Sequence, residues 1–557
     1  MKAITLTTTT RALLAGMMTC SLALTAITAT QHAAQPVRAE NVSQTRDTTS
    51  VTLHKLGVKN ALQIENNGQV LSDAELPAGA EKLDGAKFQA YDVTELFWNV
   101  KNSADWQNKT NKETMTYISE NWSQVRTEYS DDFEAVGDAK TTANGGQATW
   151  SELATKKDDV YRIYLFEEVA GVKDYMKALP VVMGLPSENG VVREAYHFYP
   201  KNVGMQKDLL DDQGNPLPDA NNDGNIVYDF EVGQAFTYRT TLTLPANLDA
   251  MVGDKYEHDV MSFKDIMSEK GTDFVADSLT IKDGGTDVTA AFENVWRNYQ
   301  DSNGNNWGNQ NAGFSFEIAL NDPALSATDR QNLLALKGKT LTFEYQMRIN
   351  GDAKPTQDIG NTFTYGNKPV GSDQWTYIDD DAPEIETGGM KILKKSSQGA
   401  QAPLSGAQFK LSRQKGDLTE YAQLWWRDAT GKLTQDNPDP AGQYQPDDIQ
   451  WVTEAEATTL VSGEGDILGQ INIGGLEGDD YKLKEVKAPL GYHIINVENP
   501  ITVAEGEVGT VELATNDIFN TPDSGFLPVT GSTGILAFLI VGGLAMGSAV
   551  YYKKRRA

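Results

Sequence analysis

Two residue types that often build extracellular proteins and metal sites are scarce in this chain. The only cysteine, Cys20, lies in an apolar stretch that we expect to be removed, so the mature protein has no disulfide bond. The five histidines are far apart and show no H-x-x-H spacing, which argues against a zinc site. Any covalent stabilisation of the fold must therefore come from another chemistry.

Basic residues are outnumbered, with 48 lysines and arginines against 77 aspartates and glutamates and a net charge of −29. An acidic surface suits a soluble extracellular protein and argues against nucleic acid as a partner. The segment Gly338-Lys339-Thr340 ends like a phosphate loop, but Leu333 stands where that loop requires glycine. We expect a turn there, and no nucleotide or other cofactor.

The first 40 residues have the pattern of a secretory signal peptide. Lys2 and Arg11 give the positive start, residues 12–29 are mostly apolar, and residues 37–39 offer a cleavage site. A lipid on Cys20 is the alternative, but the two residues before it are a poor context for lipid attachment. The chain is expected to be secreted.

The C-terminus combines a pentapeptide, an uncharged span and a basic tail, in that order. The pentapeptide is Leu527, Pro528, Val529, Thr530 and Gly531. Residues 535–552 carry no charge and as a helix would be about 27 Å long, enough to cross a membrane. The basic residues 553–556 are expected to stay in the cytoplasm.

This arrangement over residues 527–557 resembles the cell-wall sorting signal read by sortases, the transpeptidases of Gram-positive bacteria. The resemblance implies cleavage between Thr530 and Gly531, an acyl-enzyme at Thr530 and transfer of the threonine to an amine. The alternative is an ordinary membrane anchor that follows an L-P-x-T-G string by chance.

A short string occurs twice, which indicates two related domains on either side of a different one. Residues 83–88 and 404–409 both read L-x-G-A-x-F. Downstream of each, a tyrosine precedes a glutamate by four residues, at Tyr164 and Glu168 and again at Tyr481 and Glu485.

Alternation of apolar and polar side chains predicts β-structure in the middle of the chain. Residues 341–349 alternate in this way, as in a strand with one buried face, and residues 236–244 do the same. The plausible helices are few and short, near 326–336 and 453–459. The expected fold class is all-β, with tandem sandwiches.

The L-x-G-A-x-F and Y-x-L-x-E-x-x-A-P-x-G-Y strings resemble the B-type repeat of collagen-adhesin (Cna) proteins, an immunoglobulin-like β-sandwich. The resemblance is strong for residues 388–522 and weaker for 41–201, where an insertion lengthens the first connection. Residues 203–386 resemble the A-type relative in three-domain shaft pilins of Gram-positive bacteria. The resemblance implies three tandem immunoglobulin-like sandwiches of Cna-B, Cna-A and Cna-B type.

Domains of these families often contain a spontaneous amide bond between lysine and asparagine side chains, promoted by a buried carboxyl. Burial lowers the pKa of the lysine, so that the amine is neutral, and raises the pKa of the carboxyl, so that it can carry a proton. Strand parity places three trios on inward faces, because residues two apart share a face. The trios are Lys394, Glu485 and Asn520; Lys207, Asp265 and Asn361; and Lys55, Glu168 and Asn202.

Other assignments stay open within this interpretation. In the last domain Lys391 or Lys395 can replace Lys394, and Asn516 can replace Asn520. The general alternative is that the trios are unlinked polar residues at strand ends, with lysines that extend to water.

The segment Tyr199-Pro200-Lys201-Asn202 resembles the pilin motif whose lysine accepts the sorting-signal threonine of the next subunit. If Asn202 is buried, parity exposes Lys201 on the opposite face, as an acceptor requires. Pro200 removes a backbone donor, which favours a strand end or edge. The alternative is a surface lysine in an interdomain turn.

One segment has the spacing of a calcium loop, with Asp219, Asn221 and Asp223 before Gly224. Phe230 stands where the bidentate glutamate of such a loop belongs. A surface turn rich in asparagine and aspartate is the better interpretation, and no metal site is predicted.

Together these features predict a major pilin, a sortase substrate and not an enzyme. A pilin-specific sortase would join Thr530 to Lys201 of a sister chain, and a housekeeping sortase would attach the fibre to peptidoglycan in the cell wall. Tip or base pilins and host surface ligands are further expected partners. The rival hypotheses are a monomeric wall-anchored adhesin with the same stalk and a secreted enzyme with sandwich accessory domains.

Overall fold

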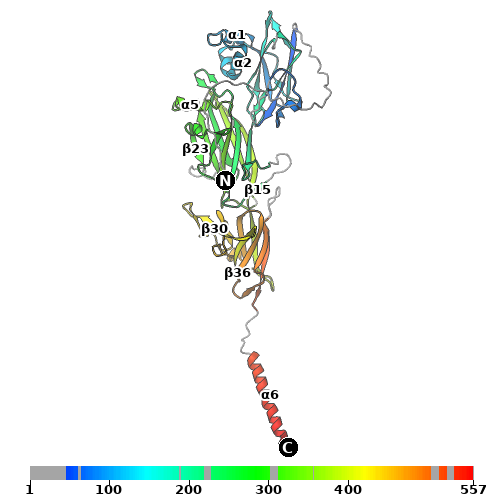
Figure 1. The fold of residues 1–557 in the computed structure, drawn as a ribbon, viewed down its shortest axis with the longest axis vertical. Helices are drawn as coiled ribbons and strands as arrows, with labels where there is room; N and C mark the ends of the chain where they lie inside the picture. The colour runs from blue at the N-terminus through cyan, green and yellow to red at the C-terminus, as the bar shows by residue number, and fades with distance from the viewer. Residues whose placement is uncertain are drawn as a thin grey trace, which may run out of the picture.

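The computed structural model describes residues 46–555 except 60–63, 65, 187–189, 219–226, 302–311, 356, 504–513 and 524–531. Three β-sandwiches follow one another along the long axis, and a C-terminal helix extends beyond them (Figure 1). The predicted signal peptide (1–40), the candidate calcium ligands Asp219, Asn221 and Asp223, and the pentapeptide 527–531 lie outside the described residues.

The first domain has a three-stranded sheet in the order β12-β1-β7, a second sheet built on β11-β10-β4-β5, and a short sheet β13-β2-β3. Its strands are β1 (Thr48–His54), β2 (Leu56–Val58), β3 (Glu81–Lys82), β4 (Lys87–Asp92), β5 (Glu134–Ala135), β6 (Lys140–Thr141), β7 (Gln147–Ala154), β8 (Lys156–Lys157), β9 (Val160–Tyr161), β10 (Ile163–Ala170), β11 (Val181–Gly184), β12 (Ala195–Phe198) and β13 (Lys201–Val203).

The second domain packs a sheet built on β14-β16-β25-β21-β22 against the sheet β15-β27-β26-β19-β24-β23. Its strands are β14 (Met205–Leu210), β15 (Val227–Asp229), β16 (Ala235–Thr243), β17 (Met251–Val252), β18 (Lys255–Tyr256), β19 (His258–Met267), β20 (Thr272–Phe274), β21 (Thr280–Asp283), β22 (Thr286–Asp287), β23 (Trp296–Asp301), β24 (Gly313–Ala319), β25 (Thr340–Ile349), β26 (Ile359–Pro369) and β27 (Thr376–Glu386). The alternation predicted for residues 341–349 is confirmed, because the odd-numbered side chains of β25 are all buried.

The third domain pairs the sheet β32-β35-β28-β39-β37 with a sheet built on β31-β30-β29-β36-β38. Its strands are β28 (Gly388–Ser396), β29 (Gln408–Lys415), β30 (Leu418–Arg427), β31 (Leu433–Thr434), β32 (Gln443–Tyr444), β33 (Asp448–Val452), β34 (Leu460–Val461), β35 (Gln470–Leu476), β36 (Asp479–Lys487), β37 (Tyr492–Ile494), β38 (Glu498–Val503) and β39 (Ala514–Pro522). The first and last of these strands, β28 and β39, pair in parallel.

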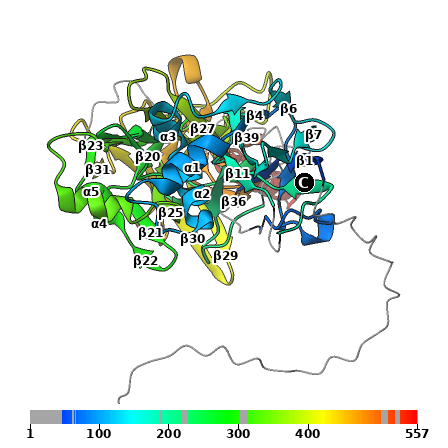
Figure 2. The same ribbon diagram turned by 90° about the horizontal axis from the view of Figure 1, so that it is seen from above.

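The helix predictions need correction in the first domain. Three helices there were not predicted: α1 (Thr94–Asn102), α2 (Asn111–Glu120) and α3 (Trp122–Glu128). They gather as one group (Figure 2) and share a small apolar core with β10. Their apolar residues follow helical spacing, as with Leu96, Phe97 and Val100, but the segment is polar enough to read as a loop.

The remaining helices agree only in part with the prediction. Helix α5 (Ala327–Leu334) confirms the expected helix near 326–336, and α4 (Thr289–Glu293) is a single short turn that was not predicted. Residues 453–459 form turns instead of a helix, since they offer no apolar stripe to bury.

Helix α6 (Ser532–Arg555) contains the stretch 535–552 that was predicted to cross a membrane. Among the described residues no helix is long and apolar enough to do so, and this span is not confirmed.

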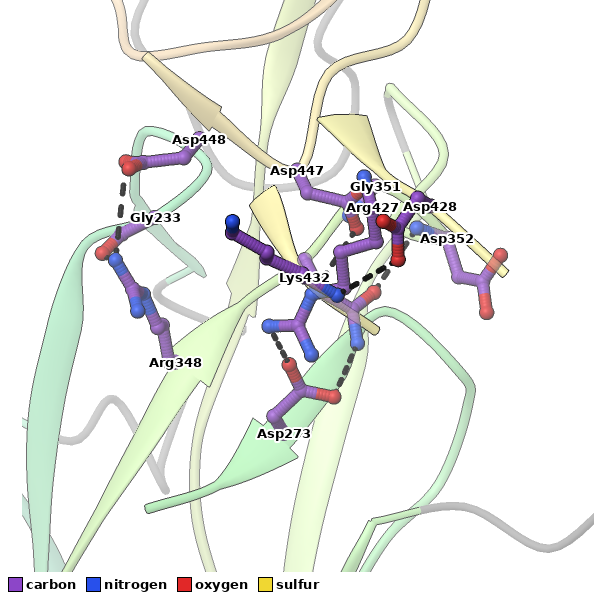
Figure 3. Close-up of polar contacts among 11 residues, drawn as sticks. Gly233, Asp273, Arg348, Gly351, Asp352, Arg427, Asp428, Lys432, Asp447 and Asp448 are labelled. Atoms are coloured by element: carbon purple, nitrogen blue, oxygen red, sulfur yellow. Dashed lines mark hydrogen bonds and ion pairs between the residues drawn. The ribbon is translucent and has the colours of Figure 1, made fainter. Parts of the chain in front are cut away.

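The second and third domains share one continuous apolar core, whereas the first domain has two clusters of its own. Polar contacts close the joint between the second and third domains (Figure 3). Arg427 donates to Asp273 at 2.6 Å, and Asp447 accepts from the backbone N–H of Gly351 at 3.1 Å. Arg348 of the second domain forms an ion pair with Asp448 of the third, with 3.8 Å between nitrogen and oxygen. We infer that these two domains move as one unit.

A buried glutamate adds to this joint. Glu231 of the second domain accepts a hydrogen bond from the Trp451 indole of the third at 2.9 Å, and Arg413 lies 4.0 Å above the Trp451 ring. Burial raises the pKa of Glu231 to about 7. The carboxyl therefore takes up a proton near neutral pH.

The contribution of Glu231 to the stability of the joint should be larger in acid than at neutral pH. A carboxyl with a raised pKa in the folded state contributes fully below its ordinary pKa of 4.5, and that contribution is lost as the pH rises through about 7. Between pH 4.5 and about 7, the free energy of unfolding should fall in the wild type by up to about 3 kcal/mol more than in Glu231→Gln, as thermal unfolding at each pH would show. The exposed Glu464→Gln should leave the profile unchanged. Identical profiles for wild type and Glu231→Gln would contradict the assignment.

Candidate functional site

The third domain holds the first of three buried clusters of lysine, carboxyl and asparagine. Lys394 projects from β28, Asn520 from the neighbouring strand β39 and Glu485 from β36 in the facing sheet. The Lys394 amine donates to Asn520 Oδ1 at 2.6 Å and to Glu485 Oε2 at 3.1 Å. Asn520 Nδ2 donates to Glu485 Oε1 at 2.7 Å. The three side chains form a closed ring of hydrogen bonds with no more than 2% exposure.

The first domain repeats this ring. Lys55 follows β1, Asn202 lies in β13, and Glu168 comes from β10 in another sheet. The Lys55 amine donates to Glu168 Oε2 at 2.7 Å and also to Asn202 Oδ1. Asn202 Nδ2 donates to Glu168 Oε1 at 2.9 Å, and the backbone N–H of Ala178 donates to the same carboxylate at 2.8 Å.

The cluster in the second domain is built differently. Lys207 lies in β14 of one sheet, while Asp265 in β19 and Asn361 in β26 lie in the other. The Lys207 amine donates to Asp265 Oδ2 and, at 2.6 Å, to the hydroxyl of Tyr345. Asn361 Nδ2 donates to the same hydroxyl at 3.2 Å. Among the described contacts, none joins Lys207 directly to Asn361.

Burial changes the pKa of the three lysines and of Glu485 in the direction that the chemistry requires. Burial lowers the pKa of Lys55 to about 8, although Glu168 opposes the shift. It also lowers the pKa of Lys394 and of Lys207, each against an adjacent carboxylate that raises it. Burial raises the pKa of Glu485. In the third domain a neutral amine and a protonated carboxyl are therefore both accessible inside the core.

Such clusters can form an amide. A neutral amine is a nucleophile, an asparagine carbonyl is its electrophile, and a neighbouring acid can move the proton that the departing ammonia needs. In the first and third domains direct contacts hold the amine and the carboxamide together before any reaction, which lowers the entropic part of the barrier. Within the described ranges, no group of histidine, cysteine and carboxylate side chains is placed to hold a metal ion.

The alternative residues in the third domain do not enter its cluster. Lys391 is exposed, and Asn516 is exposed as well. Lys395 points to the other face of β28 and pairs with Asp517 at 2.7 Å. The geometry therefore favours Lys394 and Asn520.

Lys201 lies in β13, directly before Asn202 and on the opposite face of the strand. Strand β13 is the edge of its three-stranded sheet. Tyr199 stacks on His54 with ring centroids 4.7 Å apart, which fixes the segment that leads into the strand. The predicted exposure of Lys201 needs correction: its side chain is half-buried, and burial lowers its pKa. Strand parity predicts on which face of β13 the Lys201 side chain lies, but it does not predict which other residues pack against that face.

One residue of the second cluster was missed. The alternation over residues 341–349 predicts Tyr345 as a core residue, and its exposure of 1% confirms this. The sequence signal for its role is the hydroxyl, because a buried tyrosine hydroxyl usually needs a hydrogen-bond partner and so indicates polar groups in the core.

Comparison with known proteins places two of the domains in families. Residues 46–203 match the model of the N-terminal D1 domain of Gram-positive pilin subunits. Residues 388–517 match the model of the SpaA prealbumin-like fold domain. No curated protein sequence matches the chain.

Three major pilins of solved structure are similar to this chain at low sequence identity. The major pilin SpaD from Corynebacterium diphtheriae is 18% identical, with 87% of this chain and 99% of that chain covered and a TM-score of 0.44. The major pilin SpaA from the same organism is 16% identical, with 85% of this chain and 100% of that chain covered and a TM-score of 0.41. The major pilin RrgB from Streptococcus pneumoniae is 15% identical, with 86% and 100% covered and a TM-score of 0.41.

The two family matches cover the first and third domains and together just over half of the chain. A pilin D1 domain at one end and a SpaA-type domain at the other are joined by an all-β middle domain. The chain therefore belongs to the pilin subunits of Gram-positive bacteria.

Proposed function

We propose that this chain is the major pilin of a surface fimbria and that its copies are joined covalently from Thr530 of one to Lys201 of the next. The observation that carries the proposal is the alternation in β13. Asn202 turns into the core, so its neighbour Lys201 turns to the outer face of an edge strand. Partial burial also lowers the pKa of Lys201, which increases the fraction of neutral amine.

The enzymes and the anchor belong to the same proposal. A pilin-specific sortase forms the bond between copies, a housekeeping sortase joins the basal copy to peptidoglycan, and the chain itself is a substrate and not an enzyme. The sorting signal 527–557 provides the acyl group for both steps. Tip or base pilins and host surface ligands are the further partners of such a fibre.

The three buried clusters are proposed to form amides between Lys394 and Asn520, Lys55 and Asn202, and Lys207 and Asn361. In each, the lysine amine attacks the asparagine Cγ, a new C–N bond forms, and the side-chain amide nitrogen leaves as ammonia. In the first and third domains the glutamate serves as the proton carrier, because its two oxygens contact the amine and the leaving nitrogen. Formation of the amide with release of ammonia requires no oxidant and no cofactor.

These bonds would protect the fibre against tension. Each bond would close a loop that contains most of a domain. A bond that closes a loop of about 100 residues or more contributes roughly 4–5 kcal/mol if it behaves as a disulfide does. In the third domain the bond joins β28 to β39, the first and last strands. In the second domain Asn361 lies in β26, so β27 remains outside the closed loop.

A monomeric wall-anchored adhesin is the alternative function, and Lys201 distinguishes the two. In wall extracts boiled in detergent, the wild type should give a ladder of covalent multimers that Lys201→Ala abolishes. The matched control is Lys173→Ala, which removes an exposed lysine of the same domain, 84% exposed in its side chain, and should leave the ladder intact. A single wild-type band would refute polymerisation.

The internal bonds have a direct signature in the mass of the protein. The purified chain should be lighter than its sequence mass by one ammonia for each bond. Glu485→Ala should restore one ammonia and lower the stability of the third domain by roughly 4–5 kcal/mol. Glu454→Ala removes a partly exposed glutamate that pairs with Lys484, and it should keep the wild-type mass. An undiminished wild-type mass would exclude all three bonds.

The position of Lys201 predicts unequal mechanical roles for the bonds. If tension enters at Lys201 and leaves at the C-terminus, almost all of the first domain lies outside the stretched path. Stretching single molecules between these points should show longer extension for Glu485→Ala than for wild type. Glu168→Ala, which removes the promoting acid of the first domain, should extend no further than wild type. Equal lengthening by both variants would show that force runs through the first domain.

A further inference from the structure

The cluster in the second domain lacks the closed ring that the other two share. In the other clusters one glutamate touches both the lysine amine and the asparagine Nδ2. Aspartate is shorter by one methylene group, and Asp265 contacts Lys207 alone among the members of its trio. Asp265 Oδ1 and Asn361 Oδ1 are buried and have no hydrogen-bond partner.

Tyr345 fills the place that the longer carboxyl takes elsewhere. Its hydroxyl accepts a hydrogen bond from Lys207 Nζ at 2.6 Å and another from Asn361 Nδ2 at 3.2 Å. These two nitrogens are the atoms that must lose and gain a proton when the amide forms. The hydroxyl is thus the only described group in contact with both.

We propose that Tyr345 is a catalytic residue of the second domain, whose hydroxyl passes the proton from Lys207 to the leaving nitrogen of Asn361. This inference rests on the proposed amide between these two residues. Asp265 first takes a proton from the Lys207 ammonium, which leaves a neutral amine. The amine attacks Cγ of Asn361 and forms the new C–N bond.

The relay then balances the remaining proton. As the bond between Cγ and Nδ2 breaks, the Tyr345 hydroxyl gives its proton to Nδ2 and takes one from Nζ. Ammonia leaves, the amide remains, and Tyr345 ends as the neutral phenol with which it began. The proton on Asp265 can leave with the ammonia as ammonium.

The surroundings of Tyr345 suit a relay and not a charged intermediate. Burial raises the pKa of Tyr345 well above its usual value, so the hydroxyl stays neutral and can both donate and accept. Its ring packs among buried aromatic residues, with Phe314 at 5.1 Å and Tyr238 at 5.8 Å between ring centroids. The ring is therefore held in place while the proton moves.

Tyr238 offers a matched control. It pairs with Tyr345 across β16 and β25, it is fully buried, and its ring lies 4.8 Å from Lys207 Nζ. Its hydroxyl, however, has no hydrogen-bond partner. Loss of this hydroxyl removes a buried polar atom beside the lysine without touching the proton path.

The test compares Tyr345→Phe and Tyr238→Phe in the full chain. Peptide mass spectrometry follows the Lys207–Asn361 bond over time after synthesis, and the bonds of the first and third domains serve as internal references. Tyr345→Phe should slow the bond of the second domain more than tenfold and leave the other two complete, whereas Tyr238→Phe should form all three at the wild-type rate. Formation at the wild-type rate in Tyr345→Phe would overturn the inference.

A second variant separates proton transfer from packing. Incorporation of 3,5-difluorotyrosine at position 345 keeps the hydroxyl and the ring but makes the phenol more acidic. A relay predicts a changed rate of bond formation, and an unchanged rate would overturn it even if Tyr345→Phe fails to fold. A wild-type chain without the Lys207–Asn361 bond would instead refute the proposed function of this cluster, which distinguishes the two failures.

Discussion

The lysine ammonium buried against a carboxyl is the interaction on which the three domains depend. Lys55 and Lys394 are fully buried, and an unpaired charge in such a place would be strongly destabilising. The adjacent carboxylate makes burial tolerable, but ion pairs in a dry core gain little net stability. Transfer of the proton to the carboxyl removes both charges and leaves a nucleophile beside its target. The same desolvation that strains the ion pair thus favours the neutral amide that would replace it.

Strand parity was enough to predict which side chains meet inside the sandwiches. Lys394 shares a face with Ile392, and Asn520 with Ile518, and all four are buried in the structure. A strand has a side-chain period of two, so a single known core residue fixes the direction of its neighbours. The general class of fold followed from the same periodicity.

Parity could not show what depends on contact between distant strands. The hydroxyl of Tyr345 reaches Lys207 only because β14 and β25 lie in one sheet while Asn361 faces them from the other. The half-burial of Lys201 depends on packing outside its own strand. Helices α1 to α3 were missed because their stability comes from an apolar face packed on the first domain, which a polar local sequence hides.

The joints between domains differ in a way that matches the proposed path of tension. The second and third domains share a core and charged contacts across their joint, whereas the first keeps separate cores. Strand β27 lies in a part of this path that no proposed amide encloses, since it follows Asn361 and leads into β28. It is held on one side by β26 and on the other by β15.

Strand β15 is in turn tied to the third domain, because Asp229 at its end accepts from the backbone N–H of Gly478 and Glu231 beyond it contacts Trp451. Tension on β27 is therefore shared with the joint. The shaft would resist extension through the two amides of the second and third domains and through the interface between these domains. Lys201 lies directly before the second domain, where this path begins.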